Sequence, residues 1–240
     1  MDIQSGDISE KIFTGVLWYL AFIFSTTLHE ASHAFAAMRL GDLTAYMGGH
    51  VTLDTIPHIR REPLGTVVVP ILSYIFGGWM IGWASVPYNA EWALQYPRRA
   101  AIMSLAGPIA NLALVICSAT IIRAGIAGGI FLPPESINFA HVTEAAHLGF
   151  FEPVSTFLSI LFSLNLLLFM FNLLPLPPLD GAGVAPLLMP EETAKRYLTF
   201  VRNSSFAFFG LIVAWNVFGY LYSPIHLIAI NLLYHGLHYH

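Results

Sequence analysis

The sequence is poor in charge and in cysteine. Only 10% of its 240 residues are Asp, Glu, Lys or Arg, compared with roughly 25% in ordinary soluble domains. The ten Lys and Arg are spread thinly, so the chain lacks the basic stripe that binds a nucleic-acid backbone. A single cysteine, Cys117, excludes an internal disulfide and a cysteine-rich metal site. We therefore expect neither a nucleic-acid partner nor a disulfide scaffold.

Apolar residues take the place of charge. They make up 56% of the chain, whose mean hydropathy is +0.68, and a helix of about 20 such residues crosses a bilayer. Spanning helices are predicted at residues 12–38, 100–122, 153–174 and 204–222, with a short apolar segment at residues 224–239 that begins at a proline. The predicted fold class is an all-α polytopic membrane protein with about four to six transmembrane helices. We expect residues 1–240 to form a single membrane-embedded domain.

The stretch between the first two predicted helices is irregular. Residues 64–83 are apolar, but Pro70, Gly77 and Gly78 interrupt them, which favours a re-entrant segment over a spanning helix. Residues 39–63 are polar, contain several glycines and include short strand-like stretches. We expect a small β-hairpin at the membrane surface, at residues 43–56.

One pentapeptide has the pattern of a zinc site. His29, Glu30 and His33 form the motif H-E-x-x-H near the end of the first predicted helix. Residues four apart share a helix face, so both imidazoles reach one metal ion, while the glutamate lies beside it as a base for a metal-activated water. Ionisable side chains within a membrane helix are costly and mark functional sites. The motif therefore predicts a metal site inside the membrane.

A catalytic zinc takes three protein ligands and leaves one position open. The best candidate for the third ligand is Asp180, which follows the predicted helix 153–174 at the end of the sequence FNLLPLPPLDG. The prolines end that helix, and Gly181 lets the backbone turn beside the carboxylate. We expect one Zn²⁺ per chain, bound by His29, His33 and Asp180.

Four stretches of the chain, in order, resemble the motifs of the site-2 protease family, the intramembrane zinc metalloproteases. They are HEASH at His29–His33, HIRREPLGT at His58–Thr66, SLAGPIANL at Ser104–Leu112 and NLLPLPPLDG at Asn172–Gly181. The chain is similar to the compact prokaryotic members without PDZ or CBS domains. The resemblance implies an enzyme of the prokaryotic cell (inner) membrane that hydrolyses peptide bonds within or near the transmembrane segments of other proteins.

The same resemblance implies roles for single residues. It makes His29, His33 and Asp180 the zinc ligands and Glu30 the catalytic glutamate. It places Asn172 near the scissile peptide, where its amide stabilises the oxyanion.

Other polar residues keep two interpretations. His58 either assists the substrate or transition state, as the resemblance implies, or is a surface histidine. Asn111 and Gly107-Pro108 allow close helix packing, with a substrate contact by Asn111 as the alternative. No role is assigned to His50. The late histidines are expected at the membrane interface rather than in a second metal site: His226, His235, His238 and His240.

A re-entrant segment at residues 64–83 makes the helix of His29 and the helix before Asp180 run in the same direction, as one zinc requires. It also places eight of the ten Lys and Arg on one side of the membrane, which marks that side as cytoplasmic. These are Arg39, Arg60, Arg61, Arg98, Arg99, Lys195, Arg196 and Arg202. We expect an N-terminus outside and an active site facing the cytoplasm.

Two other functions would use some of the same residues. Intramembrane His and Asp also line the ion pathways of metal transporters, but a transporter gives Glu30 no task. An inactive relative that binds membrane proteins without cutting them is disfavoured, because every expected catalytic group is present. The expected partners are transmembrane substrates and the lipid bilayer. The sequence leaves open which substrates are cut and whether the chain forms a homo-oligomer.

Overall fold

The computed structural model describes residues 5–201, 204–234 and 239. Within them, four helices are long and apolar enough to cross a membrane, and the rest of the regular structure is short. The long helices are α1 (Ser5–Leu40), α6 (Pro97–Ala127), α7 (Phe151–Asn172) and α10 (Ser204–Leu233). This architecture confirms the all-α polytopic class, and the helices coincide with the four predicted spans.

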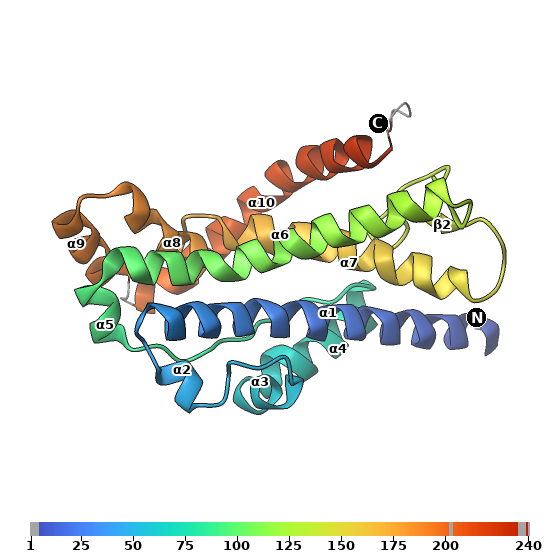
Figure 1. Cartoon of the computed structure of the whole chain (residues 1–240). Coiled ribbons are helices and arrows are strands. Elements are labelled where there is room, and N and C mark those ends of the chain that lie inside the picture. The colour runs from blue at the N-terminus through green and yellow to red at the C-terminus, as the bar shows by residue number, and fades with distance from the viewer. Residues whose placement is uncertain (1–4, 202–203, 235–238, 240) are drawn as a thin grey trace.

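The rest of the helical structure is short. It consists of α2 (Thr44–Met47), α3 (Thr55–Arg61), the π-helix η1 (Leu64–Val68), α4 (Val69–Gly77), α5 (Ala90–Gln95), α8 (Asp180–Val184), the 3₁₀-helix η2 (Ala185–Leu188) and α9 (Glu191–Val201). Helices α2, α5, α8 and α9 lie towards the end of the bundle at which α1 ends and α6 begins, which we call the α9 end, whereas α3 and α4 lie beside the middle of α1 (Figure 1). Because α1 and α7 both run towards the α9 end, the segment after α7 can bring Asp180 to His29.

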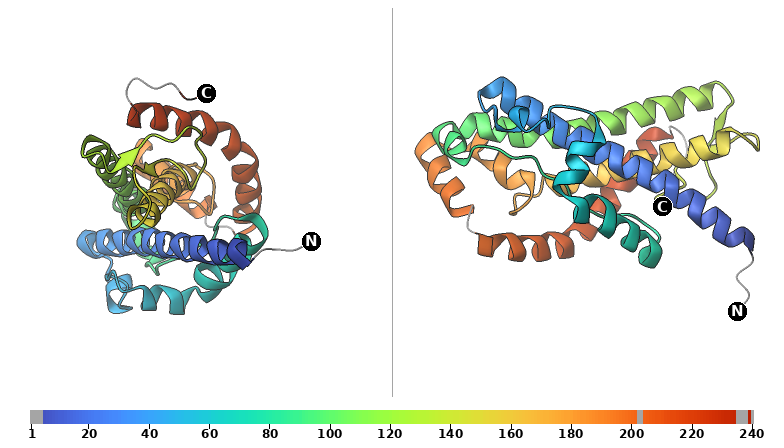
Figure 2. Two further views of the ribbon diagram at one scale, coloured as in Figure 1. Left: turned by 90° about the vertical axis from the view of Figure 1, so that its right-hand side faces the viewer. Right: turned by 90° about the horizontal axis from the view of Figure 1, so that it is seen from below.

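The core of the fold is the packing of α1, α6 and α7. Trp18 and Phe22 of α1 are buried against Ile160 and Leu164 of α7. Helix α10 lies at the side of this trio and leaves most of its surface exposed (Figure 2). Burying about 25 cal/mol per Å² of apolar surface stabilises a core in water. In lipid, however, packing and interhelical hydrogen bonds take over that role.

The segment between α3 and α5 enters the bundle and turns back. It runs as η1 and α4 towards the middle of α1, and residues 80–89 then return in extended form to α5 at the α9 end (Figure 1). Gly78 makes the reversal at the end of α4, with a left-handed φ of 75° that suits glycine. The chain thus comes back to the end it left, as expected for residues 64–83.

The β-hairpin expected at residues 43–56 is wrong, because α2 and α3 occupy this stretch. Asp42 accepts a hydrogen bond from the Thr44 N–H, at 2.9 Å, and Asp54 accepts one from the Ile56 N–H, at 3.0 Å. These aspartates satisfy N–H groups at the helix starts, an arrangement that favours helix over strand. The antiparallel pair that the structure describes lies elsewhere, between β1 (Phe131–Leu132) and β2 (Glu144–Ala145).

The expected break at residue 224 is also wrong. Helix α10 continues through Pro224 to Leu233, which membrane helices tolerate because neighbouring groups compensate for the lost backbone hydrogen bond. His226 therefore lies within a long helix, where its Nε2 is 3.3 Å from the Ser163 hydroxyl of α7. His235, His238 and His240 lie outside the described residues.

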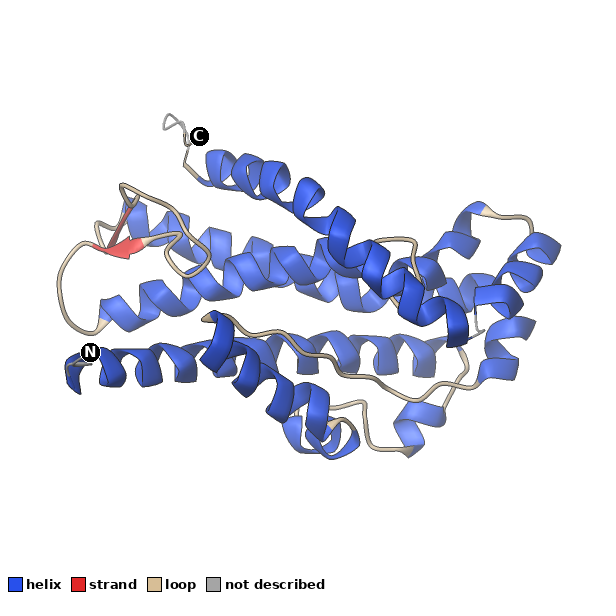
Figure 3. Ribbon diagram, turned by 180° about the vertical axis from the view of Figure 1, so that it is seen from behind, coloured by secondary structure: helices blue, strands red, loops and turns tan. Residues whose placement is uncertain are grey.

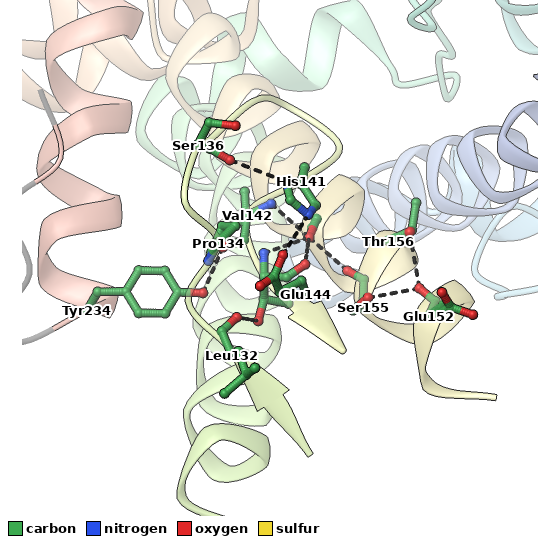
Figure 4. A network of polar contacts seen from close by, with 12 residues as sticks. Leu132, Pro134, Ser136, His141, Val142, Glu144, Glu152, Ser155, Thr156 and Tyr234 are labelled. Atoms are coloured by element: carbon green, nitrogen blue, oxygen red, sulfur yellow. Dashed lines mark hydrogen bonds and ion pairs between the residues drawn. The ribbon is translucent and has the colours of Figure 1, made fainter. Parts of the chain in front are cut away.

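The loop between α6 and α7 closes the end of the bundle at which α1 begins, where the two strands lie (Figure 3). Ser159 of α7 anchors it by accepting hydrogen bonds from the N–H groups of Val142 and Thr143, at 2.9 and 3.1 Å. The Tyr234 hydroxyl donates to the Val142 carbonyl at 2.7 Å (Figure 4). On its inner side, Phe139 stacks on Trp18 of α1, with ring centroids 5.3 Å apart. We call residues 130–146 the closing loop.

Candidate metal centre

Helices α1 and α8 bring three ligand atoms together. The Nε2 atoms of His29 and His33 are 3.0 Å apart, and Oδ2 of Asp180 is 3.0 Å from the first and 3.3 Å from the second. Atoms bound to a tetrahedral zinc at about 2.0–2.1 Å lie roughly 3.3–3.4 Å from each other. The spacing of the three atoms therefore fits one zinc ion.

The outer nitrogens of both imidazoles are hydrogen-bonded. Nδ1 of His33 lies 2.7 Å from the Met103 carbonyl, which only accepts, so this nitrogen carries the proton. Nδ1 of His29 lies 2.6 Å from the Asn111 side-chain oxygen and donates to it in the same way. Each neutral imidazole then presents a bare lone pair at Nε2. Three electron-rich atoms facing one another at 3.0–3.3 Å repel unless a cation lies between them.

Gly107 of α6 leaves the space that such an ion needs. A Cβ atom added at Gly107 would fall on the Nε2 atoms of His33 and His29. A side chain here would therefore occupy the position of the metal. This finding gives the SLAGPIANL motif a more specific reason for its glycine than close helix packing alone.

Glu30 lies beside the ligands in a cavity of about 510 Å³. His33 and Asp180 also line this cavity, and Glu30 itself is only 7% exposed. The opposite wall is the extended segment, from which Ala84 to Tyr88 contribute. A carboxylate is thus placed next to the metal position without being one of its ligands, as the motif predicts.

The HIRREPLGT motif holds the extended segment in place. Oε1 of Glu62 accepts a hydrogen bond from the Ser85 hydroxyl at 2.6 Å, and the Gly65 carbonyl accepts one from the Trp83 N–H at 3.1 Å. Gly65 of η1 and Gly82 approach so closely that a Cβ at Gly65 would collide with the Trp83 carbonyl oxygen and one at Gly82 with the Gly65 carbonyl oxygen. At the other end of the extended segment, Oδ2 of Asp42 accepts a hydrogen bond from the Asn89 N–H at 2.7 Å. The segment is therefore tied down at both ends.

Gly181 is needed for a different reason than the one expected. Its backbone is not left-handed, but a Cβ here would collide with the carbonyl oxygens of Leu173 and Leu174. The start of α8 can therefore pack directly on the last turn of α7. This contact fixes Asp180 relative to the helix that precedes it.

The remaining predicted site residues lie further from the ligands. Asn172 is half-buried in the last turn of α7, and neither it nor His58 is among the described residues lining the cavity. His58 is buried on α3, not on the surface, and its Nε2 lies 3.3 Å from the Thr52 carbonyl oxygen. Its ring centroid is 5.5 Å from that of His50. Burial, followed by the charges of His58 and Arg61, lowers the pKa of His50.

Sequence reasoning missed the polar residues behind the ligands. The Asn111 side-chain oxygen contacts Nδ1 of His29, a contact that the sequence did not predict, and its amide donates to Asn165 of α7 at 2.8 Å. Asn165 was not singled out, although an asparagine in the middle of an apolar helix is itself a signal of function. Ser85 and Asp42 gave no such signal because serine and aspartate are ordinary loop residues.

Comparison with known proteins agrees with this geometry. The model of Peptidase family M50 matches residues 17–215. The Bacillus subtilis protein named "Putative zinc metalloprotease YwhC" is 36% identical over 174 residues, which are 71% of this chain and 68% of that protein. The Mycobacterium tuberculosis protein named "Putative zinc metalloprotease Rip2" is 34% identical over 177 residues, 73% of this chain and 59% of that protein.

No solved structure matches the chain. The family model nevertheless covers all four long helices in whole or in part, together with the three ligand residues and Glu30. The apolar helices, the ligand set and the matched region lead to one assignment. The chain belongs to Peptidase family M50, the site-2 protease family of membrane metalloproteases.

Proposed function

We propose that this chain is an intramembrane zinc metalloprotease, a single membrane-embedded domain that cuts peptide bonds within or near the transmembrane segments of other proteins. The observation that supports this most is the position of Glu30. It lies in a cavity with two of the three proposed ligands, His33 and Asp180, on a helix long and apolar enough to span the bilayer. A transporter would need the ligands but not this carboxylate.

Zinc bound at such a site polarises a carbonyl and lowers the pKa of a water molecule. Glu30 would take a proton from a water molecule in the cavity and deliver it to the leaving amine. Its burial beside the ligands excludes bulk water and strengthens these electrostatic interactions. Asn172 is proposed to stabilise the oxyanion and His58 to assist the substrate or transition state.

The extended segment supplies a binding edge for the unwound substrate. Among the described residues, no hydrogen bond uses the backbone N–H or C=O groups of residues 84–88, although these residues line the cavity. A substrate helix must open to expose its carbonyls, and an extended peptide pairs readily with a free edge. We propose that the scissile stretch of the substrate pairs with residues 84–88.

We propose the orientation of the chain in the membrane from the positions of its Lys and Arg residues. The cationic residues of α9, of the end of α1 and of the start of α6 lie at the α9 end, whereas Lys11 and Arg123 lie near the opposite ends of α1 and α6 (Figure 1). The positive-inside rule makes the α9 end cytoplasmic. The proposed location is the prokaryotic cell (inner) membrane, with the active site open to the cytoplasm and the N-terminus outside.

The test compares the purified protein with Glu30→Gln. Zinc is measured in both, and both are incubated with a panel of single-span substrates. We expect the wild type to cleave and Glu30→Gln to bind zinc without cleaving. Equal cleavage by both, or transport of zinc into liposomes without cleavage, would overturn the proposal.

A further inference from the structure

A chain of buried hydrogen bonds runs from the proposed metal ligand His29 of α1 through α6 and α7 and returns to α1 at Ser25, one helical turn from His29. Nδ1 of His29 donates to Oδ1 of Asn111 at 2.6 Å, and Nδ2 of Asn111 donates to Oδ1 of Asn165 at 2.8 Å. Nδ2 of Asn165 then donates to the Leu161 carbonyl at 2.8 Å and to the Ser25 hydroxyl at 2.9 Å. Ser25, Asn111 and Asn165 are each 0% exposed. The chain therefore joins α1, α6 and α7 without contact with solvent.

The direction of every hydrogen bond in this chain follows from its last member. The Leu161 carbonyl can only accept, so the atom of Asn165 that faces it is the nitrogen. The Asn165 oxygen is thereby turned towards Asn111 and needs a donor, which fixes the Asn111 amide with its nitrogen on that side. The Asn111 oxygen is left facing His29, and it can only accept a proton from Nδ1.

We propose that Asn165 is a positioning residue that selects the metal-binding tautomer of His29 through Asn111. Without Asn165, the Asn111 amide is free to rotate by half a turn and donate to Nδ1. The proton of His29 would then lie on Nε2, where it blocks the metal position. This inference rests on the proposed metal site.

The two histidine ligands differ in this respect. His33 donates directly to the Met103 carbonyl, a backbone group that cannot rotate. His29 depends on an amide that has two orientations, so it alone needs a further residue. Asn165 is not among the residues that line the cavity, so it acts without touching substrate. Partners of this kind typically change metal affinity by about 10–100-fold.

The experiment measures zinc affinity of the purified full chain by competition with a chromophoric chelator. Asn165→Leu removes the amide at similar volume and is expected to weaken zinc binding by about 10–100-fold. Asn111→Asp provides the matched background, because a carboxylate accepts from Nδ1 in either orientation. In that background Asn165→Leu should leave zinc affinity unchanged. Ser118→Ala is the control, since its buried hydroxyl bonds only to carbonyls within α6.

Three results overturn the inference: wild-type affinity in Asn165→Leu, equal loss in both backgrounds, or equal loss in Ser118→Ala. Asn165→Ala repeats the comparison if the leucine variant does not fold. The tautomer is checked independently by ¹⁵N NMR of the His29 ring in the metal-free protein, at a pH high enough that the ring carries a single proton, which should lie on Nδ1 in the wild type and on Nε2 in Asn165→Leu. If the wild type itself binds no zinc, the proposed function fails, which is a different outcome.

Discussion

Single residues with no charge shape this metal centre as much as the ligands do. Gly107 leaves the space in front of His29 and His33, and Gly181 lets Asp180 pack on the preceding helix. Asn111 and Met103 hold the outer nitrogens of the imidazoles. The candidate ligands His29 and His33 are recognisable from the sequence because H-E-x-x-H has a fixed spacing. Their supports are not, because a glycine or an asparagine in an apolar helix has many uses.

Gly107→Ala is expected to abolish most zinc binding while the protein stays folded. The added methyl group would occupy the metal position, whereas alanine in a helix is more favourable than glycine by about 1 kcal/mol. Zinc content and thermal stability of the purified variant check this. Gly219→Ala of α10, where a Cβ meets no atom within 4 Å, is the control and should keep its zinc. Full zinc content in Gly107→Ala would contradict the position of the site.

His50 makes stability depend on pH. Its pKa is lowered in the folded chain by burial and by the charges of His58 and Arg61, so the unfolded chain, with a pKa of about 6.5, binds the proton more readily. Stability is then complete above about pH 6.5 and decreases as the pH falls below it. The melting temperature should therefore be lower at about pH 5.5 than at about pH 7.5.

His50→Asn should reduce this difference, because asparagine does not titrate. His147→Asn, a substitution of an exposed histidine in the loop before α7, is the control and should leave the difference unchanged. An equal pH effect in His50→Asn and the wild type would show that other groups cause it.

Among the elements, the extended segment could be predicted only in part. Pro70, Gly77 and Gly78 in an apolar run correctly indicated that residues 64–83 do not form one spanning helix. The partners that straighten residues 80–89 could not be predicted, since Glu62, Asp42 and Gly65 act through contacts made only in the folded chain. The hairpin prediction failed for a related reason. Helix capping by Asp42 and Asp54 outweighed weak strand propensity.

Proline substitutions test whether substrate pairs with this segment. Adjacent N–H groups of an extended chain point to opposite edges, so Ala84→Pro and Val86→Pro should act alike and Ser85→Pro differently. Loss of one main-chain hydrogen bond should slow cleavage by about threefold to tenfold, with zinc binding unchanged. Ser85→Pro also removes the hydrogen bond from the Ser85 hydroxyl to Glu62, and Ser85→Ala is the control for that loss. Equal rates in all three proline variants would contradict strand pairing.

At the scale of the whole molecule, the four long helices could be predicted from the length of the apolar segments. The position of Asp180 near His29 could be predicted from the direction in which α7 runs. The proposed orientation rests on the eight cationic residues that the sequence places on one side of the membrane. Protease added outside spheroplasts should remove a tag from the N-terminus and spare a tag inserted between α8 and α9, near Pro190. The same treatment after lysis should remove both tags. Protection of the N-terminal tag in intact spheroplasts would reverse the proposed topology.

The closing loop bears on the permeability of the membrane. A hydrolase in a bilayer must admit water to its cavity, yet a continuous water column would let protons leak down their gradient. Phe139 stacks between Trp18 of α1 and Tyr222 of α10, with ring centroids 5.3 and 6.3 Å away. This aromatic layer lies on the side of the core away from the α9 end. We therefore predict that the cavity admits water from one side only, so that a protease built in this way would leave the proton-motive force of the cell intact.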